Sequence, residues 1–295
     1  MRFDAVSPYA RRIVSVTVFI AAASALLWGV GRQWREIVLL VGNLDLMALV
    51  GAAVAGSVML VFASLELGLL AHPGVTSPEP VLRTAGIYLL SQPLKYLPGR
   101  VWSFAYQIMN IGKRVGNRMA IAASLSQLCL GTFGSLLVLG ISLGGKAILL
   151  PISFFVVGAW LWRGGIARYL GIAGPEWMSV GQTACVLVLL ALEWVAFALV
   201  AWLVCKSFSS GGEYSFLMLA LYAVAWLVGS LVSITPGGLV VREGGFVVLC
   251  ESFGIPGEIG GTFAVVARLA FTVSELVTAG IVIAAYRKKL FGSEV

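Results

Sequence analysis

Four basic side chains lie within stretches of this chain that are otherwise apolar enough to cross a bilayer. A charged group at the centre of a membrane costs about 2.5–3.5 kcal/mol on insertion-based scales, so such residues face the protein interior or a water-filled space. An arginine fork matches the oxygens of a phosphate and keeps its charge when it is partly desolvated. The set predicts a site for an anionic head group, and its members are Lys95, Arg100, Arg242 and Arg268.

Two proline-glycine breaks interrupt the same stretches. The first is Pro98-Gly99 and the second is Pro236-Gly237-Gly238. Hydrocarbon offers no water to the backbone, so a helix broken at that depth must lie against protein or a wet cavity. A helix that restarts after the break directs free N–H groups and the positive end of its dipole into that space, and glycine lets a ligand approach closely. We expect the two broken helices to line a central cavity that binds the substrate.

Acidic residues accompany the basic set. Adjacent residues on a helix point about 100° apart, which predicts that Arg242 and Glu243 each have a partner elsewhere. Alternatively, Arg242 and Arg268 neutralise Glu243 and Glu275 as buried structural pairs. Glu66 and Glu193 each stand alone in a long apolar run. We expect these two to be charge partners of the basic set, with proton binding as the alternative.

The composition is that of a polytopic membrane protein. Of 295 residues, 60% are hydrophobic and only 11% are charged, and the mean hydropathy is +0.99. A span needs about 20 apolar residues, so we predict a single all-helical domain over residues 1–295 with about eight membrane segments. Apolar runs cover residues 13–30, 46–71, 119–143, 147–162, 180–205, 214–234 and 257–286, and the broken segments cover 84–111 and 235–254.

Basic residues beside the membrane segments predict their orientation. One group precedes the first run and another follows the last, so the positive-inside rule places both termini in the cytoplasm and requires an even number of crossings. A third group follows the first break and favours the same side, which makes 84–111 a hairpin. If both breaks are hairpins, an odd number of full spans remains, in conflict with the rule. The three groups are Arg2, Arg11 and Arg12; Arg287, Lys288 and Lys289; and Lys113, Arg114 and Arg118.

Other signals for chemistry are weak. The segment from Gly140 has the spacing of a P-loop, but Ala147 replaces the Ser or Thr that would hold magnesium. The four cysteines are not spaced for a metal or redox site, and the only histidine, His72, stands beside a Pro-Gly turn, which predicts a solvated loop residue. We expect no enzyme activity, no metal and no cofactor. The net charge of +7 follows the membrane edges, which argues against nucleic acid as a partner.

Two motifs, in this order, resemble the lysylphosphatidylglycerol synthase transmembrane, or flippase-like, family. They are Lys95-Tyr-Leu-Pro98-Gly99-Arg100-Val-Trp102 and Pro236-Gly237-Gly238-Leu-Val-Val-Arg242-Glu243-Gly244. Arg268 also resembles a family position. The chain departs from the family pattern at Val240 and near Trp102, where glycine is common. Family members that transfer amino acids carry a separate soluble domain, so we do not expect synthesis of an aminoacylated lipid here.

The resemblance implies movement of a polar-headed lipid across a bacterial or archaeal cytoplasmic membrane. The lipid is either an aminoacylated phospholipid or a polyprenyl-phosphate-linked saccharide. Two alternatives stay open: a non-transporting membrane partner of a glycosyltransferase or lipid synthase, and a secondary carrier of a small anion. Each break follows two apolar runs and precedes one, a layout typical of transporters built from an internal repeat.

Overall fold

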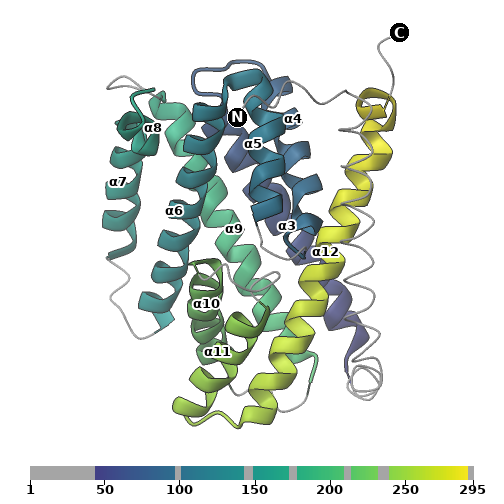
Figure 1. Cartoon of the computed structure of the whole chain (residues 1–295). Helices are drawn as coiled ribbons and strands as arrows, with labels where there is room; N and C mark the ends of the chain where they lie inside the picture. The colour runs from purple at the N-terminus through teal and green to yellow at the C-terminus, as the bar shows by residue number, and fades with distance from the viewer. Residues whose placement is uncertain are drawn as a thin grey trace.

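The computed structural model describes residues 44–96, 101–142, 149–172, 178–208, 214–231 and 239–291, and the regular elements in these ranges are all helices (Figure 1). Four of the helices are long and apolar enough to cross a membrane. They are α3 (Leu46–Ala71), α6 (Asn117–Ser142), α9 (Val180–Lys206) and α12 (Gly257–Phe291). The all-helical membrane class is therefore confirmed. The predicted span 13–30 lies outside the described residues.

Helices α3 and α9 lie antiparallel because polar groups tie both of their ends together. The Asp45 carboxylate caps the first turn of α3, and the Asp45 backbone N–H donates to the Ser207 carbonyl just past α9 over 2.8 Å. At the other end, the Ser179 hydroxyl caps α9, and Gln182 in its first turn accepts a 2.8 Å hydrogen bond from the Gly74 N–H. Each helix therefore ends where the other begins.

Two helical hairpins lie between the long helices. The first hairpin consists of α4 (Pro78–Ser91), the 3₁₀ turn η2 (Gln92–Tyr96) and α5 (Val101–Val115), and the second consists of α10 (Ser215–Leu231) and α11 (Leu239–Ser252). The legs of each hairpin pack together, and in the first the Gln107 side chain donates to the Ser91 hydroxyl over 2.8 Å. Figure 1 shows the first hairpin in the upper half of the molecule and the second in the lower half.

The second hairpin corrects one predicted span. The apolar run 214–234 was expected to cross the membrane, yet α10 has only 17 residues and packs beside α11. The packing of α10 on α11 makes the two helices the legs of one hairpin, and residues 232–238 between them lie outside the described residues. Helix α7 (Leu149–Trp162), followed by the short α8 (Gly165–Tyr169), has only 14 residues. The eight predicted segments thus reduce to four helices of spanning length among the described residues.

The order of elements repeats along the chain. A long helix, a hairpin and a second long helix occur first as α3, the first hairpin and α6, and then as α9, the second hairpin and α12. Helix α4 contacts α12, and α10 contacts α6, so each hairpin packs on the last long helix of the other unit. This arrangement brings residues distant in sequence into the centre of the molecule.

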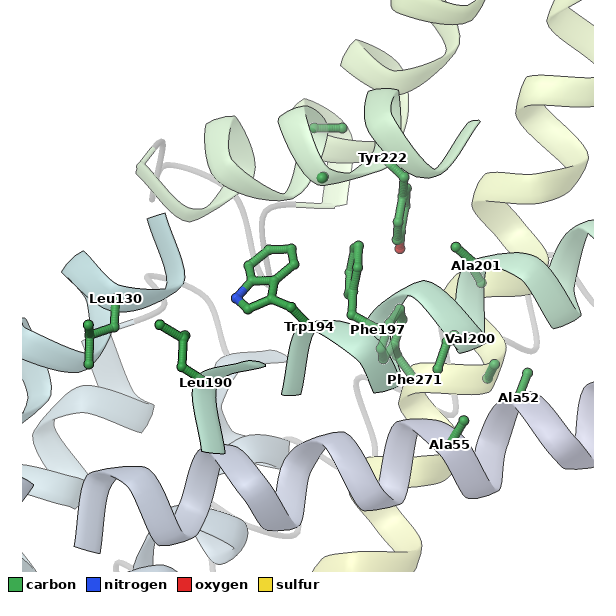
Figure 2. Close-up of a cluster of buried hydrophobic side chains, with 14 of the residues drawn as sticks. Ala52, Ala55, Leu130, Leu190, Trp194, Phe197, Val200, Ala201, Tyr222 and Phe271 are labelled. Atoms are coloured by element: carbon green, nitrogen blue, oxygen red, sulfur yellow. The ribbon is translucent and has the colours of Figure 1, made fainter. Parts of the chain in front are cut away.

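Aromatic rings from α9, α10 and α12 fill the core (Figure 2). Trp194 lies 5.0 Å from Phe197, measured between ring centroids, and Phe197 stacks on Tyr222 at 5.8 Å and on Phe271 at 6.0 Å. The side chains that α3 contributes here are small alanines, and small residues allow helices to approach closely in a membrane. The core therefore fixes α10 of the second hairpin against both long helices.

His72 is half-buried, so its prediction as a solvated loop residue is wrong. Its Nε2 atom is 2.9 Å from the Thr84 hydroxyl on α4, because the turn after α3 folds back onto that helix. Burial, followed by the positive charge of Arg114 at the end of α5, lowers the pKa of the imidazole. The end of α3, the start of α4 and the end of α5 therefore meet at one end of the molecule.

A glycine on α6 gives a test of this packing. A Cβ atom at Gly134 would overlap the Trp194 indole, which is itself held against Phe197 and Trp226. We expect Gly134→Ala to lower the free energy of unfolding by about 1–3 kcal/mol, the usual cost of overpacking. Denaturant unfolding in detergent, followed by tryptophan fluorescence, measures the change. The matched control on the same helix is Gly140→Ala, where nothing lies within 4 Å of the added methyl group; equal losses would contradict the packing argument.

Candidate functional site

Charged side chains from both hairpins and α12 converge in the middle of the molecule. Their closest link is an ion pair between Lys95 on η2 and Glu275 on α12. Lys95 also lies within electrostatic range of Arg268 on α12 and Arg242 on α11. We call the group the charged cluster, and its members are Lys95, Arg242, Glu243, Arg268 and Glu275.

The position of Lys95 is fixed by its neighbour Tyr96. The buried Tyr96 hydroxyl lies 3.0 Å from the Thr272 hydroxyl on α12. The Arg268 guanidinium lies over the Tyr96 ring, 4.5 Å from its centroid, a geometry in which the ring face attracts the cation. Tyr96 therefore joins η2, the turn between the two legs of the first hairpin, to α12, and it holds Lys95 and Arg268 near each other.

Arg242 pairs with its neighbour Glu243, which corrects the expectation that adjacent residues on a helix would not pair. The Arg242 Nε and Nη2 atoms donate to Glu243 Oε1 over 3.1 and 2.7 Å. The Arg242 stem lies against Gly229 of α10, and its guanidinium lies 5.6 Å from the centroid of the Tyr222 ring. Because α10 confines the stem, the long side chain bends back toward Glu243 and overcomes the angular separation of the two Cα positions.

Several hydrogen-bonding groups in the charged cluster remain unsatisfied. Glu243 Oε1 also lies 3.9 Å from Arg268 Nη1, so one oxygen serves two arginines. Among the described residues, Arg268 Nη2, Glu243 Oε2 and Glu275 Oε2 are buried without a hydrogen-bond partner. Buried polar groups in native proteins are normally paired, and exceptions often mark a site for water, an ion or a ligand. Three cations here face two carboxylates, which leaves an excess of one positive charge among the described members.

The charged cluster lies at the depth where charge is most costly. Arg268 and Glu275 occupy the middle part of the spanning stretch Gly257–Ala285. The Glu275 side chain is only 3% exposed, and that of Arg268 is 12% exposed. Because a charge in hydrocarbon is stable only when it faces protein or water, this placement implies an internal polar region at mid-depth.

Glu66 and Glu193 do not belong to the charged cluster. Glu275 pairs with Lys95, not with an arginine as the alternative of structural pairs had it, whereas Glu243 does pair with Arg242. No ion pair joins Glu66 or Glu193 to another described residue. Neither acid is paired with Lys95, Arg242 or Arg268, and Arg100, the fourth member of the basic set, lies outside the described residues.

Both breaks fall outside the described residues. This applies to Pro98, Gly99 and Arg100 in the first motif and to Pro236, Gly237 and Gly238 in the second. The residues flanking the breaks, Lys95 and Arg242, are both in the charged cluster. No group of three or more residues able to hold a metal ion occurs in the described part of the chain.

Sequence reasoning missed the aromatic and hydroxyl partners of the charged cluster. Tyr96 and Thr272 join η2 to α12, and Tyr222 lies under Arg242. The sequence could have indicated Tyr96 as a site residue, because it stands within the first motif beside Lys95. The sequence gives no such indication for Tyr222, since a tyrosine in an apolar run does not show which basic residue will pack on its ring.

The fold and this cluster define an all-helical membrane protein with a buried, partly unsatisfied group of charges at mid-depth. No protein-family model matches the chain, and no curated protein matches its sequence. The resemblance to the flippase-like family therefore stays a prediction that rests on the two motifs and Arg268.

Proposed function

We propose that this protein is a lipid transporter of the flippase type, which binds a phosphate-containing head group at the charged cluster while the acyl or prenyl tails stay in the bilayer. The observation that carries the proposal is the excess positive charge of the cluster, together with the unpartnered Nη2 atom of the buried Arg268. An aminoacylated phospholipid and a polyprenyl-phosphate-linked saccharide both have the required anionic phosphate.

The cations of the cluster have different roles in this proposal. Arg268 offers a free N–H to the phosphate, whereas Arg242 and Lys95 are held by Glu243 and Glu275 until an anion competes for them. Charge-assisted hydrogen bonds to phosphate are about twice as strong as neutral ones. Arg100, the glycines of both breaks and the helix ends beside them supply further donors. An anionic lipid moving outward gains about 2.3 kcal/mol per charge per 100 mV of membrane potential, so no nucleotide is needed.

We propose in addition that the end of the molecule where α3 meets α4 and α5 faces the cytoplasm. Exposed basic residues gather there, whereas the opposite end is mainly acidic, and the positive-inside rule favours this orientation. The basic end carries the exposed Lys113, Arg114, Arg118, Arg163 and Arg168, and the half-buried Arg83 paired with the exposed Glu79; the other end carries the exposed Asp45, Lys206, Glu251 and Glu258.

This orientation removes the conflict over the number of crossings. With α10 as a hairpin leg, the chain crosses in the predicted span 13–30 and in α3, α6, α7, α9 and α12, and both hairpins are re-entrant. α7 is short, but the chain must return between α6 and α9, because both begin at the basic end. The number of crossings is then even, and both termini lie in the cytoplasm.

A transport assay with the purified protein tests the proposal. We expect proteoliposomes to expose an anionic phospholipid analogue to a membrane-impermeant reagent faster than protein-free vesicles do, with a smaller effect on a zwitterionic analogue. The preference follows from the net positive cluster. Equal rates with and without protein would favour a non-transporting membrane partner. Uptake of a soluble anion without lipid transfer would favour a small-anion carrier.

A further inference from the structure

A hydrogen bond between α3 and α6 fixes the register of these two helices. The Gln127 side chain of α6 donates to the Ala63 carbonyl of α3. The helices run antiparallel, because α3 ends where α4 begins and α5 ends, and α6 begins one residue after α5 (Figure 1). The residue three positions after Ala63 is therefore level with the residue three positions before Gln127, about 4.5 Å along the axis from the hydrogen bond. These two residues are Glu66 and Ser124.

Glu66 and Ser124 also lie on the facing sides of their helices. Each residue of a helix turns the chain by about 100°, so residues three apart lie only about 60° apart around the axis. Glu66 thus shares a face with Ala63, and Ser124 shares a face with Gln127. A carboxyl group, a hydroxyl and an amide therefore meet where α3 packs on α6.

The carboxyl group and the hydroxyl are buried without described partners. Glu66 is 0% exposed and Ser124 is 3% exposed. Both carboxyl oxygens of Glu66 and the hydroxyl oxygen of Ser124 lack a hydrogen-bond partner among the described residues, and no described cation forms an ion pair with Glu66. A buried carboxylate is stable only when it is paired, and unpaired buried groups often mark a site for an ion or a ligand.

The three side chains suit a small monovalent cation. Hard cations prefer carboxylate, hydroxyl and carbonyl oxygens, and the Gln127 amide oxygen lies beside the nitrogen that binds Ala63. One monovalent ion neutralises the single carboxylate of this group. A proton alone would let Glu66 donate directly to Ser124, yet no hydrogen bond joins the two. The described residues also contain no group of three or more His, Cys, Asp or Glu side chains of the kind that holds other metals.

A second acid increases the attraction for a cation. The hydrogen bonds at the two ends of α3 and α9 place Glu193 of α9 one to two turns from Glu66 along the contact between these helices. Glu193 is half-buried and has no ion pair with a described residue. Glu66 and Ser124 lie within about two turns of the helix ends at the basic end of the molecule, so an ion has only a short path from that side.

We propose that Glu66, Ser124 and Gln127 form a sodium site that joins α3 to α6. The Glu66 carboxylate supplies the negative charge, and the hydroxyl and amide oxygens complete the coordination. The ion holds the first and last long helices of one unit together. This site does not depend on the proposed transport of lipid, so either proposal can fail without the other.

Thermal unfolding of the purified protein in detergent, followed by circular dichroism, tests the site. We expect saturating Na⁺ to raise the midpoint by about 5 °C relative to K⁺ at equal ionic strength. Glu66→Gln should lose this difference and should be at least as stable as the wild type in K⁺, because it buries no charge. Glu251→Gln, an exposed acid on α11, is the control and keeps the difference. Equal wild-type midpoints in Na⁺ and K⁺, or a difference that Glu66→Gln retains, would overturn the sodium site.

Two serines of α6 test the register. Ser124 and Ser126 are both buried with unpartnered hydroxyls, but Ser126 lies about 160° away from Ser124 around the helix. We expect Ser124→Ala to weaken Na⁺ binding about tenfold and Ser126→Ala to leave it unchanged. Binding of radioactive Na⁺ measures the affinity and the stoichiometry, which we expect to be one ion per chain. Equal affinities in the two variants, or no saturable binding to the folded wild type, would overturn the assignment.

Discussion

Replacing Lys95 by methionine is expected to lower the free energy of unfolding by about 3–5 kcal/mol, the cost of removing one partner from a buried ion pair. The reason is the charge that remains. Glu275 is 3% exposed, its Oε2 atom already lacks a partner among the described residues, and Lys95 is its ion-pair partner. The measurement is denaturant unfolding in detergent followed by circular dichroism.

The double variant Lys95→Met/Glu275→Gln separates this cause from simple loss of packing. Removing both charges leaves neutral groups of similar size, so we expect most of the stability to return, since replacing a buried pair by neutral groups is often nearly neutral in stability. Lys113→Met, an exposed lysine on α5, controls for the loss of a lysine alone. If the double variant were as unstable as the single variant, the ion pair would not be what stabilises the contact between η2 and α12.

Much of this fold follows from composition and the length of apolar runs. The runs 46–71 and 180–205 correspond closely to α3 and α9, because an uninterrupted apolar segment of about 26 residues has few stable alternatives to a spanning helix. The run 214–234 was misassigned for a physical reason. A hairpin leg packed inside the protein is as apolar as a lipid-facing span, and only its partner α11 distinguishes the two.

The charged cluster was predictable in membership and unpredictable in pairing. Costly charges and backbone breaks identified Lys95, Arg242 and Arg268, and the structure places the three together. Which residues pair depends on the conformations of long side chains, and a helical wheel shows only where each residue lies around the helix axis. Confinement of Arg242 by Gly229 turns it to Glu243. The register of α3 against α9 likewise could not be read from either helix alone.

Arg268 is the residue whose loss should reduce lipid transfer most. Its Nη2 atom is buried without a partner, its Nη1 atom is 3.9 Å from Glu243, and Tyr96 fixes its plane, so the fork is positioned while much of its bonding capacity stays available. A hydrogen bond between charged groups contributes about 1.5–3 kcal/mol, which corresponds to about a 10- to 100-fold lower transfer rate for an anionic lipid in Arg268→Gln.

The companion variants decide whether geometry or charge alone is responsible. We expect Arg268→Lys to recover only part of the rate, because an ammonium keeps the charge but lacks the planar fork that stacks on Tyr96 and binds phosphate through two bonds. Arg163→Gln removes one exposed arginine outside the cluster and should leave the rate unchanged. A fully active Arg268→Gln would place the head group elsewhere. Full recovery by lysine would reduce the role of Arg268 to that of a positive charge, and the stacking on Tyr96 would then serve only to hold η2 against α12.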